Sequence, residues 1–187
     1  MTKAEIRKYI KSIIPTDSFI IEELSEKICR KLEKSDCFIK TPLILAYMPL
    51  NDEVDLSPLF IRTFELNKKL ALPRIIPDTN KMDFYLTDEN LSVKKGSFEI
   101  MEPEANEKNL IRPDSLPDGT LILVPGRAFT KEGCRLGRGK GFYDIWLSKI
   151  PQDKKNRVHL AGVCFPQQIV ESIPCDEHDI KMNSVVY

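Results

Sequence analysis

The 187-residue sequence has no excess of charge of either sign, because 28 lysines and arginines balance 28 aspartates and glutamates. A chain without net positive charge is not expected to cover a long stretch of nucleic acid. It also lacks any apolar run approaching the roughly 18 residues of a membrane-spanning helix. We therefore expect no nucleic-acid and no membrane partner, and any bound anion must be held by a local group of cations.

The cysteines lack the spacing of a structural site. The cysteines are odd in number and widely spread, and no C-x-x-C pair occurs. Zinc sites and disulfide frameworks need paired cysteines, so neither is expected. The first 14 residues also lack an apolar core of signal-peptide length. These features predict a cytoplasmic protein. The five cysteines are Cys29, Cys37, Cys134, Cys164 and Cys175.

What the sequence does contain is a pattern of apolar strands and amphipathic helices. An apolar run at 43–48, a helical pattern at 56–67 and a second run at 70–73 form a βαβ unit, which predicts a parallel sheet. Residues 87–119 have weak periodicity and are expected to wander over the surface. We predict one domain, 1–187, with an α/β fold: a Rossmann-like three-layer α/β/α sandwich with a mostly parallel sheet. Other strands are expected at 82–86, 121–124, 158–165 and 184–186, and helices at 3–14, 17–34 and 141–150.

The most informative stretch is 121–146, in which an apolar run opens into a glycine-rich loop. Alternate glycines let backbone N–H groups crowd around an oxygen cluster without Cβ clashes. The interleaved cations add charge, and the helix that follows points its positive end at the same place. The loop therefore predicts a phosphate site. Its residues are Arg135, Leu136, Gly137, Arg138, Gly139, Lys140 and Gly141.

Two familiar nucleotide motifs do not fit this loop. A P-loop requires G-x-x-x-x-G-K-[ST], but Gly133 is one residue too far from Gly139, and Gly141 stands where the hydroxyl belongs. The dinucleotide fingerprint requires its glycines directly after a strand, whereas these follow more than ten residues later. Asp144, in the first turn of the next helix, either caps that helix or reaches a magnesium ion bound to phosphates.

The order of residues here resembles the signature of the 5-formyltetrahydrofolate cyclo-ligases, also called methenyltetrahydrofolate synthetases. The signature matches at Val124-Pro125-Gly126, Phe129, Gly133, Arg135-Leu136-Gly137, Gly139, Gly141 and Tyr143-Asp144. Other segments match in order: Lys3 and Arg7, Met48, Asp52-Glu53, Pro73-Arg74, Gly162-Val163 with Phe165 and Gln168, and His178-Asp179 with Met182 and Val185-Val186. The chain departs from the family pattern at Thr130, Phe142 and Asn183.

The resemblance implies an enzyme that joins 5-formyltetrahydrofolate and ATP to give 5,10-methenyltetrahydrofolate, ADP and phosphate, with Mg²⁺ as cofactor. The formyl oxygen would attack the γ-phosphate, and N10 would then close on the activated carbon of an N5-iminium phosphate. No enzyme nucleophile is needed, so catalysis is expected to come from positioning and charge stabilisation. We expect the enzyme to be a monomer.

The resemblance also assigns roles to residues. Arg135, Arg138 and Lys140 would be the catalytic clamp on the triphosphate. Asp144 would hold magnesium, with Asp179 as a second candidate. The folate would contact Met48, Glu53, Arg138, Gly139, Lys140, Gly141 and Phe142. ATP would contact Lys3, Ala4, Glu5, Ile6, Arg7, Arg74, Arg135, Leu136, Gly137, Arg138, Gly139, Lys140, Gly141, Phe142 and Tyr143.

From the residues alone, other interpretations stay open. Fold does not fix function, so another α/β protein that binds phosphate or CoA, such as a phosphosugar isomerase, is an alternative, as is a non-catalytic folate- or nucleotide-binding module. Lys3 and Arg7, four residues apart, can form a solvated helix face. Glu53 can cap the next helix, Met48 can lie in the core, and Asp144 can be a plain cap.

Overall fold

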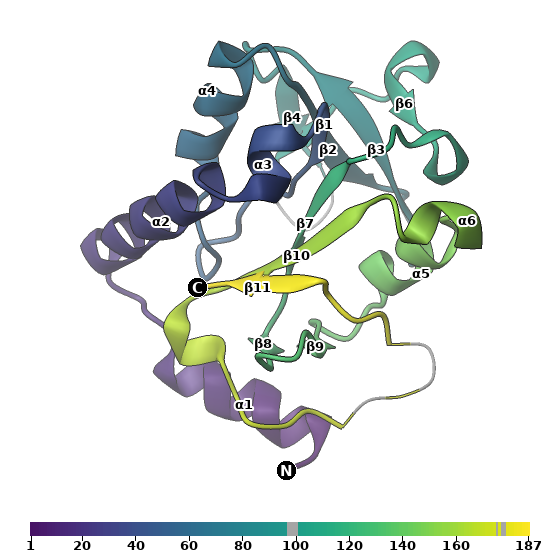
Figure 1. Ribbon diagram of the computed structural model, residues 1–187. Coiled ribbons are helices and arrows are strands. Elements are labelled where there is room, and N and C mark those ends of the chain that lie inside the picture. Colours follow the sequence, from purple (N-terminus) through teal and green to yellow (C-terminus); the bar gives the residue numbers. More distant parts are fainter. Residues whose placement is uncertain (97–100, 175, 177–178) are drawn as a thin grey trace.

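The computed structural model describes residues 1–96, 101–174, 176 and 179–187. Predictions that involve Cys175 and His178 lie outside the described residues. The core is a seven-stranded sheet with the order β11-β10-β7-β1-β2-β3-β6 (Figure 1). Its strands are β1 (Leu43–Leu45), β2 (Lys69–Ile75), β3 (Met82–Thr87), β6 (Leu110–Ile111), β7 (Leu121–Pro125), β10 (His159–Val163) and β11 (Ser184–Val186).

The sheet is mixed but mostly parallel. Strands β11, β10, β7, β1 and β2 run parallel, and β3 and β6 add antiparallel pairs at one edge. Strands β1 and β2 are joined through a helix and pair in parallel, with Leu43 opposite Lys69. This confirms the predicted βαβ unit and the α/β fold. The described part of the chain has no helix of the length and apolarity needed to cross a bilayer.

Helices cover both faces of the sheet, which explains why its central strands are apolar throughout. Ile44 and Leu123 point to the face covered by α2, α3 and α4, whereas Leu45 and Val124 point to the face covered by α5. The third layer confirms the predicted sandwich. The helices are α1 (Lys3–Ile13), α2 (Ser18–Glu33), α3 (Asp36–Lys40), α4 (Ser57–Glu65), α5 (Phe142–Ser148) and α6 (Gln152–Lys155).

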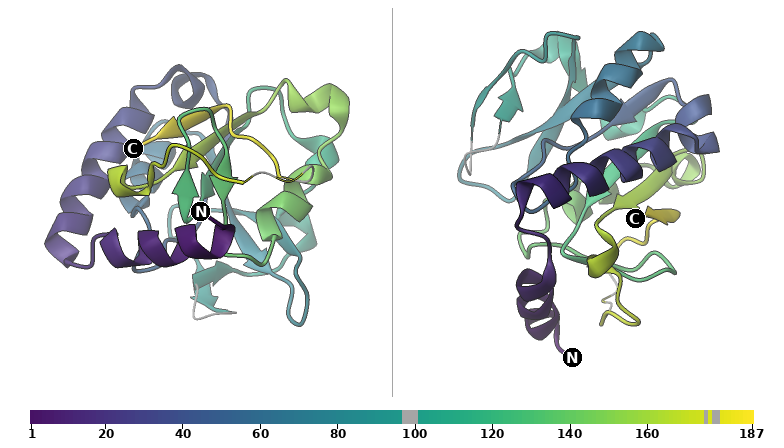
Figure 2. Two further views of the ribbon diagram at one scale, coloured as in Figure 1. Left: turned by 90° about the horizontal axis from the view of Figure 1, so that it is seen from below. Right: turned by 90° about the vertical axis from the view of Figure 1, so that its left-hand side faces the viewer.

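Helix α1 lies apart from these layers, and Figure 2 shows it projecting beyond the sheet. It begins with a capping box in which Thr2 and Glu5 satisfy each other's backbone N–H groups. Its apolar side packs Ile6 and Ile10 against Ala128 and Leu136 of the hairpin formed by β8 (Ala128–Phe129) and β9 (Arg135–Leu136). This small separate core brings the N-terminus of the chain to the glycine loop.

Three local predictions need correction. The strand at 43–48 ends at Leu45, although Ala46 still donates to the Ala71 carbonyl at 3.0 Å. Helix α3 was not predicted; the Ser35 hydroxyl caps it by accepting from Phe38 N–H at 3.3 Å. Residues 87–119 are more than a surface excursion, because they form the hairpin of β4 (Val93–Lys95) and β5 (Met101–Pro103) and the sheet strand β6. Pairing with distant strands, which local periodicity does not indicate, gives this segment its structure.

The chain also has short 3-10 turns, which are η2 (Glu107–Asn109), η3 (Pro113–Ser115) and η4 (Pro166–Gln168).

Candidate active site

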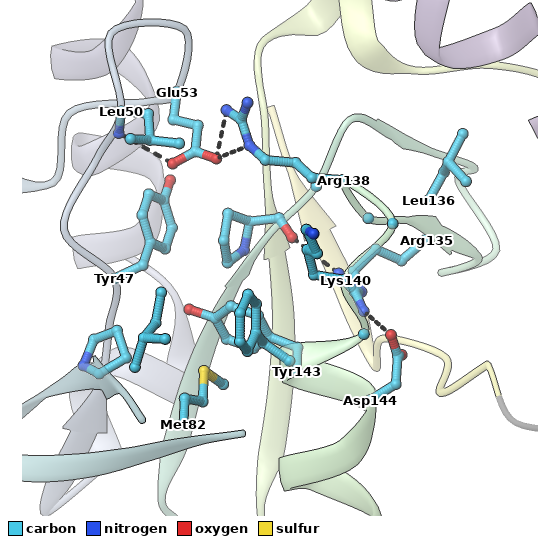
Figure 3. A pocket seen from close by; sticks show the side chains of 18 of the residues that line it. Tyr47, Leu50, Glu53, Met82, Arg135, Leu136, Arg138, Lys140, Tyr143 and Asp144 are labelled. Atoms are coloured by element: carbon cyan, nitrogen blue, oxygen red, sulfur yellow. Dashed lines mark hydrogen bonds and ion pairs between the residues drawn. The ribbon is translucent and has the colours of Figure 1, made fainter. Parts of the chain in front are cut away.

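A pocket of about 560 Å³ opens at the carboxyl ends of the central strands (Figure 3). Pro125 ends β7, Ile75 ends β2, and Met48 follows β1; all three line it. Ligands of parallel α/β sheets bind at this edge because the connecting loops meet there. The volume is typical of a small-molecule site.

The pocket has an apolar side and a charged side. Figure 3 shows Tyr47 and Met82 across the pocket from Lys140 and Arg135. The apolar side is formed by Tyr47, Met48, Leu50, Pro73, Ile75, Met82, Phe142 and Tyr143. The charged side is formed by Lys3, Arg7, Arg135, Arg138, Lys140, Asp144 and Asp179, with Leu136, Gly137, Gly139 and Gly141 between them.

The glycine loop connects the β8–β9 hairpin to helix α5. Antiparallel pairing of Ala128 with Leu136 fixes where the loop leaves the hairpin, and α5 begins directly after Gly141. Gly139 and Gly141 have φ values of +105° and +73°, a region in which residues with a Cβ are strained. The predicted loop therefore lines the pocket and depends on glycine at two positions.

Arg135 is the deepest cation of the loop. Its side chain is 5% exposed, and its Nη2 lies 2.7 Å from Asp144 Oδ2, while Nη1 donates to the Pro125 carbonyl at 3.3 Å. The two predicted side chains are therefore paired, so Asp144 orients the guanidinium. Asp144 is 28% exposed and lines the pocket. Its role as a magnesium ligand stays a prediction.

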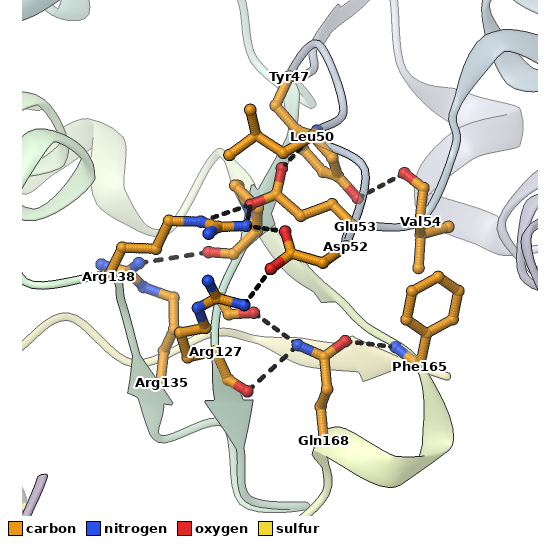
Figure 4. A network of polar contacts seen from close by, with 12 residues as sticks. Tyr47, Leu50, Asp52, Glu53, Val54, Arg127, Arg135, Arg138, Phe165 and Gln168 are labelled. Carbon is orange, nitrogen blue, oxygen red and sulfur yellow. Dashed lines mark hydrogen bonds and ion pairs between the residues drawn. The ribbon is translucent and has the colours of Figure 1, made fainter. Parts of the chain in front are cut away.

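Arg138 joins the glycine loop to the acidic loop after β1 (Figure 4). Its Nε and Nη2 lie 3.0 and 2.9 Å from Glu53 Oε1, and it also pairs with Asp52, which in turn pairs with Arg127. The other oxygen of Glu53 accepts from Leu50 N–H at 3.1 Å. Glu53 therefore holds Arg138 rather than capping the following helix, whose N-cap makes no side-chain hydrogen bond.

The charge of Asp52 is stabilised by this network. Burial by itself would raise the pKa of Asp52, but hydrogen bonds from Arg138 and Arg127 outweigh it and hold the pKa below its ordinary value of 3.8. Gln168 supports the same region, because its Nε2 donates to the Gly126 carbonyl at 2.7 Å. These contacts fix the two loops on either side of the pocket.

The N-terminal helix places two cations, Lys3 and Arg7, on the pocket wall; their contact with ATP stays a prediction. Lys3 Nζ lies 2.6 Å from Asp176 and 2.7 Å from Asp179, and Arg7 Nε donates to the Gly137 carbonyl at 2.9 Å. Hydrogen bonds to Asp176 and Asp179 raise the pKa of Lys3. Burial by itself would raise the pKa of Asp179, but hydrogen bonds from Lys3 and from the Asp176 backbone N–H lower it. The two cations thus join α1, the glycine loop and the C-terminal segment instead of forming a solvated face.

Four predicted ATP contacts lie elsewhere. Ala4, Glu5 and Ile6 do not line the pocket: Glu5 caps α1 and Ile6 is buried against the hairpin. Arg74 is also absent from the pocket wall, and its Nη1 donates to the Pro103 carbonyl at 2.8 Å. Arg74 therefore attaches the β4–β5 hairpin to β2.

The residues that depart from the family pattern have identifiable contacts. Thr130 Oγ1 accepts from Cys134 N–H at 3.3 Å, and Asn183 Oδ1 accepts from Leu160 N–H at 2.7 Å. Thr130 therefore stabilises the turn between β8 and β9, and Asn183 attaches the segment before β11 to β10. Phe142 contributes to the apolar side.

Several residues of the site were missed from the sequence. Asp52 and Arg127 complete the ion-pair network, and Glu102 lines the pocket although it lies in the stretch expected to wander. The sequence offers a signal for Asp52, which stands with Glu53 in a segment that resembles the family, but none for Glu102. The other missed wall residues are Tyr47, Leu50, Pro73, Ile75, Met82, Pro125 and Gly126.

Polar atoms inside the site also lack partners. Among the described residues, the hydroxyl of Tyr143 is buried without a hydrogen bond, and burial raises its pKa well above the ordinary value. A buried polar atom of this kind is satisfied when a ligand supplies a partner. No three His, Cys, Asp or Glu side chains of the described ranges gather into a metal-binding group.

Comparison with known proteins agrees with this geometry. The model of the 5-formyltetrahydrofolate cyclo-ligase family matches residues 2–187. The 5-formyltetrahydrofolate cyclo-ligase of Mus musculus is 33% identical over 149 residues, which cover 77% of this chain and 72% of the mouse protein.

Solved structures share the fold. The 5,10-methenyltetrahydrofolate synthetase of Aquifex aeolicus superposes with a TM-score of 0.81 at 33% identity, covering 100% of this chain and 89% of that one. The Mycoplasma pneumoniae protein has the same fold, with a TM-score of 0.75 at 22% identity and coverage of 100% and 98%. The chain therefore belongs to the 5-formyltetrahydrofolate cyclo-ligase family and is an enzyme of folate one-carbon metabolism.

Proposed function

We propose that the protein uses ATP and Mg²⁺ to convert 5-formyltetrahydrofolate into 5,10-methenyltetrahydrofolate, ADP and phosphate through an N5-iminium phosphate. The observation that carries the proposal is the two-sided pocket, in which a cationic glycine loop faces an apolar wall. A triphosphate requires a cationic loop and a pterin ring requires an apolar wall, so the two substrates can meet within one cavity.

The triphosphate is bound on the charged side. Arg135, Arg138 and Lys140 supply positive charge, and the glycine loop supplies backbone N–H groups that can approach phosphate oxygens closely. Lys3 and Arg7 close this side from helix α1. The cations stabilise charge on the transferring phosphoryl group, which is the main contribution a protein makes to this class of reaction.

The folate is bound on the apolar side. Met48, Phe142 and Tyr143 lie against the ring, and the buried Tyr143 hydroxyl can donate to or accept from a polar atom of the ligand. With the ring in that position, the formyl group would lie next to the glycine loop, because Phe142 and Tyr143 follow Gly141 directly.

The chemistry then needs positioning rather than an enzyme nucleophile. The formyl oxygen attacks the γ-phosphorus, the bond to the β-phosphate oxygen breaks, and ADP leaves. N10 attacks the formyl carbon of the N5-iminium phosphate and loses its proton, and the C–O bond breaks to release phosphate, which carries that proton away. Holding both substrates in line supplies most of the rate acceleration.

The carboxylates on the charged side fit a magnesium ion shared with phosphates. Such ions use one or two protein carboxylates together with phosphate oxygens and water. Asp144 and Asp179 both line the pocket, and they would be the protein ligands. A bound magnesium ion would neutralise phosphate charge, while Arg135 keeps Asp144 oriented.

We also propose that the enzyme acts as a monomer in the cytoplasm. Cys29, Cys37, Cys134 and Cys164 are free thiols, which is usual in a reducing compartment. Size-exclusion chromatography with light scattering should give one chain of 21.5 kDa; a dimer mass would contradict the monomer.

The proposal is tested by following near-ultraviolet absorbance of the purified protein with 5-formyltetrahydrofolate, Mg²⁺ and ATP. The methenyl chromophore should grow only when ATP is present, with one phosphate released for each methenyl group formed. ATP binding without chromophore growth would contradict the proposed reaction and favour a nucleotide-binding role.

A further inference from the structure

The apolar side of the pocket contains a buried acidic residue that none of the roles above uses. Glu102 lies on β5 of the β4–β5 hairpin, is 2% exposed and lines the pocket together with Ile75 and Met82. A carboxylate is costly to bury unless hydrogen-bond donors surround it. An apolar side chain would fill this buried position without that cost, so the acid calls for a hydrogen-bond donor.

The position of this carboxylate is fixed by the fold. Its Oε1 accepts from the Ile75 N–H at 3.1 Å, and Arg74 holds the adjacent Pro103 carbonyl. A Cβ on Gly96 would lie 2.1 Å from Glu102 Oε2, so glycine at this position leaves the carboxylate room. The hairpin therefore presents the acid at a defined place on the pocket wall.

The pocket's other wall glutamate is already occupied. Both oxygens of Glu53 are engaged, one by Arg138 and one by the Leu50 N–H. Glu53 therefore serves the ion-pair network that joins two loops. Glu102 stands apart from that network, on the apolar side of the pocket.

We propose that Glu102 is a specificity-determining residue that accepts hydrogen bonds from the 2-amino group and the neighbouring ring N–H of the pterin. This inference rests on the proposed function and extends it. A carboxylate only accepts, so it pairs with an edge that carries two adjacent donors. The corresponding edge of adenine alternates donor and acceptor, and a carboxylate repels the ring-nitrogen lone pair. Glu102 thereby directs the pterin, rather than adenine, to the apolar side.

Steady-state kinetics of Glu102→Gln test the inference. The amide keeps the shape and the contact to Ile75 but loses the charge, and we expect KM for 5-formyltetrahydrofolate to rise about tenfold. KM for ATP and kcat should change less than twofold. The matched control is Glu104→Gln on the same hairpin, whose carboxylate is 75% exposed beside Lys94 and should behave like the wild type.

A substrate analogue separates recognition from a merely structural effect. With 2-desamino-2-methyl-5-formyltetrahydrofolate, the wild type should already show the raised KM, and Glu102→Gln should raise it no further. Gly96→Ala, which displaces the carboxylate but retains it, should reduce discrimination between the two substrates. Equal losses for both substrates, or no loss for either, would overturn the inference.

Failure of the inference can be told apart from failure of the proposed function. If the wild type turns over and discrimination is independent of Glu102, the inference alone is wrong. If the wild type does not turn over, the inference can still be tested by measuring, with calorimetry, how tightly the wild type and Glu102→Gln bind each of the two folates. The inference is supported if the wild type binds the 2-amino compound more tightly than the 2-methyl compound and Glu102→Gln does not. It is overturned if the wild type binds both compounds equally.

Discussion

Arg138 on the glycine loop is held by Glu53, 85 residues earlier in the chain, through contacts of 3.0 and 2.9 Å to one carboxylate oxygen. Asp52 accepts from the same guanidinium. Arg138 therefore belongs both to the charged side of the pocket and to a network that joins two loops. A side chain shared in this way couples the placement of the acidic loop after β1 to that of the glycine loop.

Replacing Arg138 with alanine should lower kcat/KM for ATP by about 10²–10³-fold, because one positive group that stabilises the phosphoryl transition state is lost. The measurement is the initial rate of methenyl formation against ATP concentration. Lys131→Ala, an exposed cation of the preceding loop, is the control and should be unchanged. Near-normal kinetics of Arg138→Ala would remove Arg138 from the clamp.

Gly139→Ala should weaken ATP binding through the backbone. Its φ of +105° strains an alanine, so the loop must move, and we expect a loss of stability of about 1 kcal/mol together with at least tenfold weaker ATP binding. Gly119 has a φ of +80° and does not line the pocket, so Gly119→Ala should lose similar stability but keep ATP affinity. Calorimetric binding and urea unfolding measure the two effects; equal ATP affinity in both variants would contradict this prediction.

Removing magnesium with EDTA should abolish turnover, and adding Mg²⁺ should restore it. Asp144→Asn should raise the Mg²⁺ concentration needed for half-maximal rate about tenfold or more, because one of the two proposed protein ligands is lost. Asp153→Asn, an exposed acid on α6, serves as the comparison.

Thermal unfolding distinguishes this role of Asp144 from its structural one. The variant also leaves Arg135 without its 2.7 Å partner, so some stability should be lost. Lower stability with an unchanged Mg²⁺ requirement would show that Asp144 only orients Arg135.

Asp52→Asn should change stability in a pH-dependent manner. In the folded protein the pKa of Asp52 is lowered by Arg138 and Arg127 against the effect of burial, so the ionised form stabilises the fold above the unfolded value. That contribution is lost as pH falls below about 4 and through the folded pKa. We expect the variant to be about 1–2 kcal/mol less stable at pH 7 and similar to the wild type at pH 2.

Urea unfolding at both pH values measures this difference. The control is Asp118→Asn, whose carboxylate is 67% exposed beside Arg157 and should lose little at either pH. An equal loss for Asp52→Asn at pH 7 and pH 2 would mean that charge is not what Asp52 contributes.

Much of the fold follows from local patterns. The alternation of apolar runs and helical stretches predicts the βαβ unit, because strand and helix periodicities depend on residues that are close together in the sequence. The glycine loop is equally local: alternate glycines and cations over seven residues predict an anion site, and the structure places all of them on the pocket wall.

The rest of the site depends on pairing between distant segments. Ile75 and Met82 both line the pocket because antiparallel pairing of β2 with β3 sets them opposite each other. Arg74, predicted to contact ATP, instead holds Pro103, since the hairpin crosses this part of β2. Neither contact is indicated by the residues that neighbour it in the sequence.

The sequence by itself determined the α/β class, the glycine loop and the family resemblance, because each depends on residue types at short, fixed spacings. The tertiary structure decided that Glu53 holds Arg138, that Asp144 holds Arg135, and that Glu102 faces the pocket. The register of strands and the docking of loops far apart in the chain set these contacts. The physical reason is that a side chain contacts whatever group the folded backbone places next to it, and spacing along the sequence does not specify that placement.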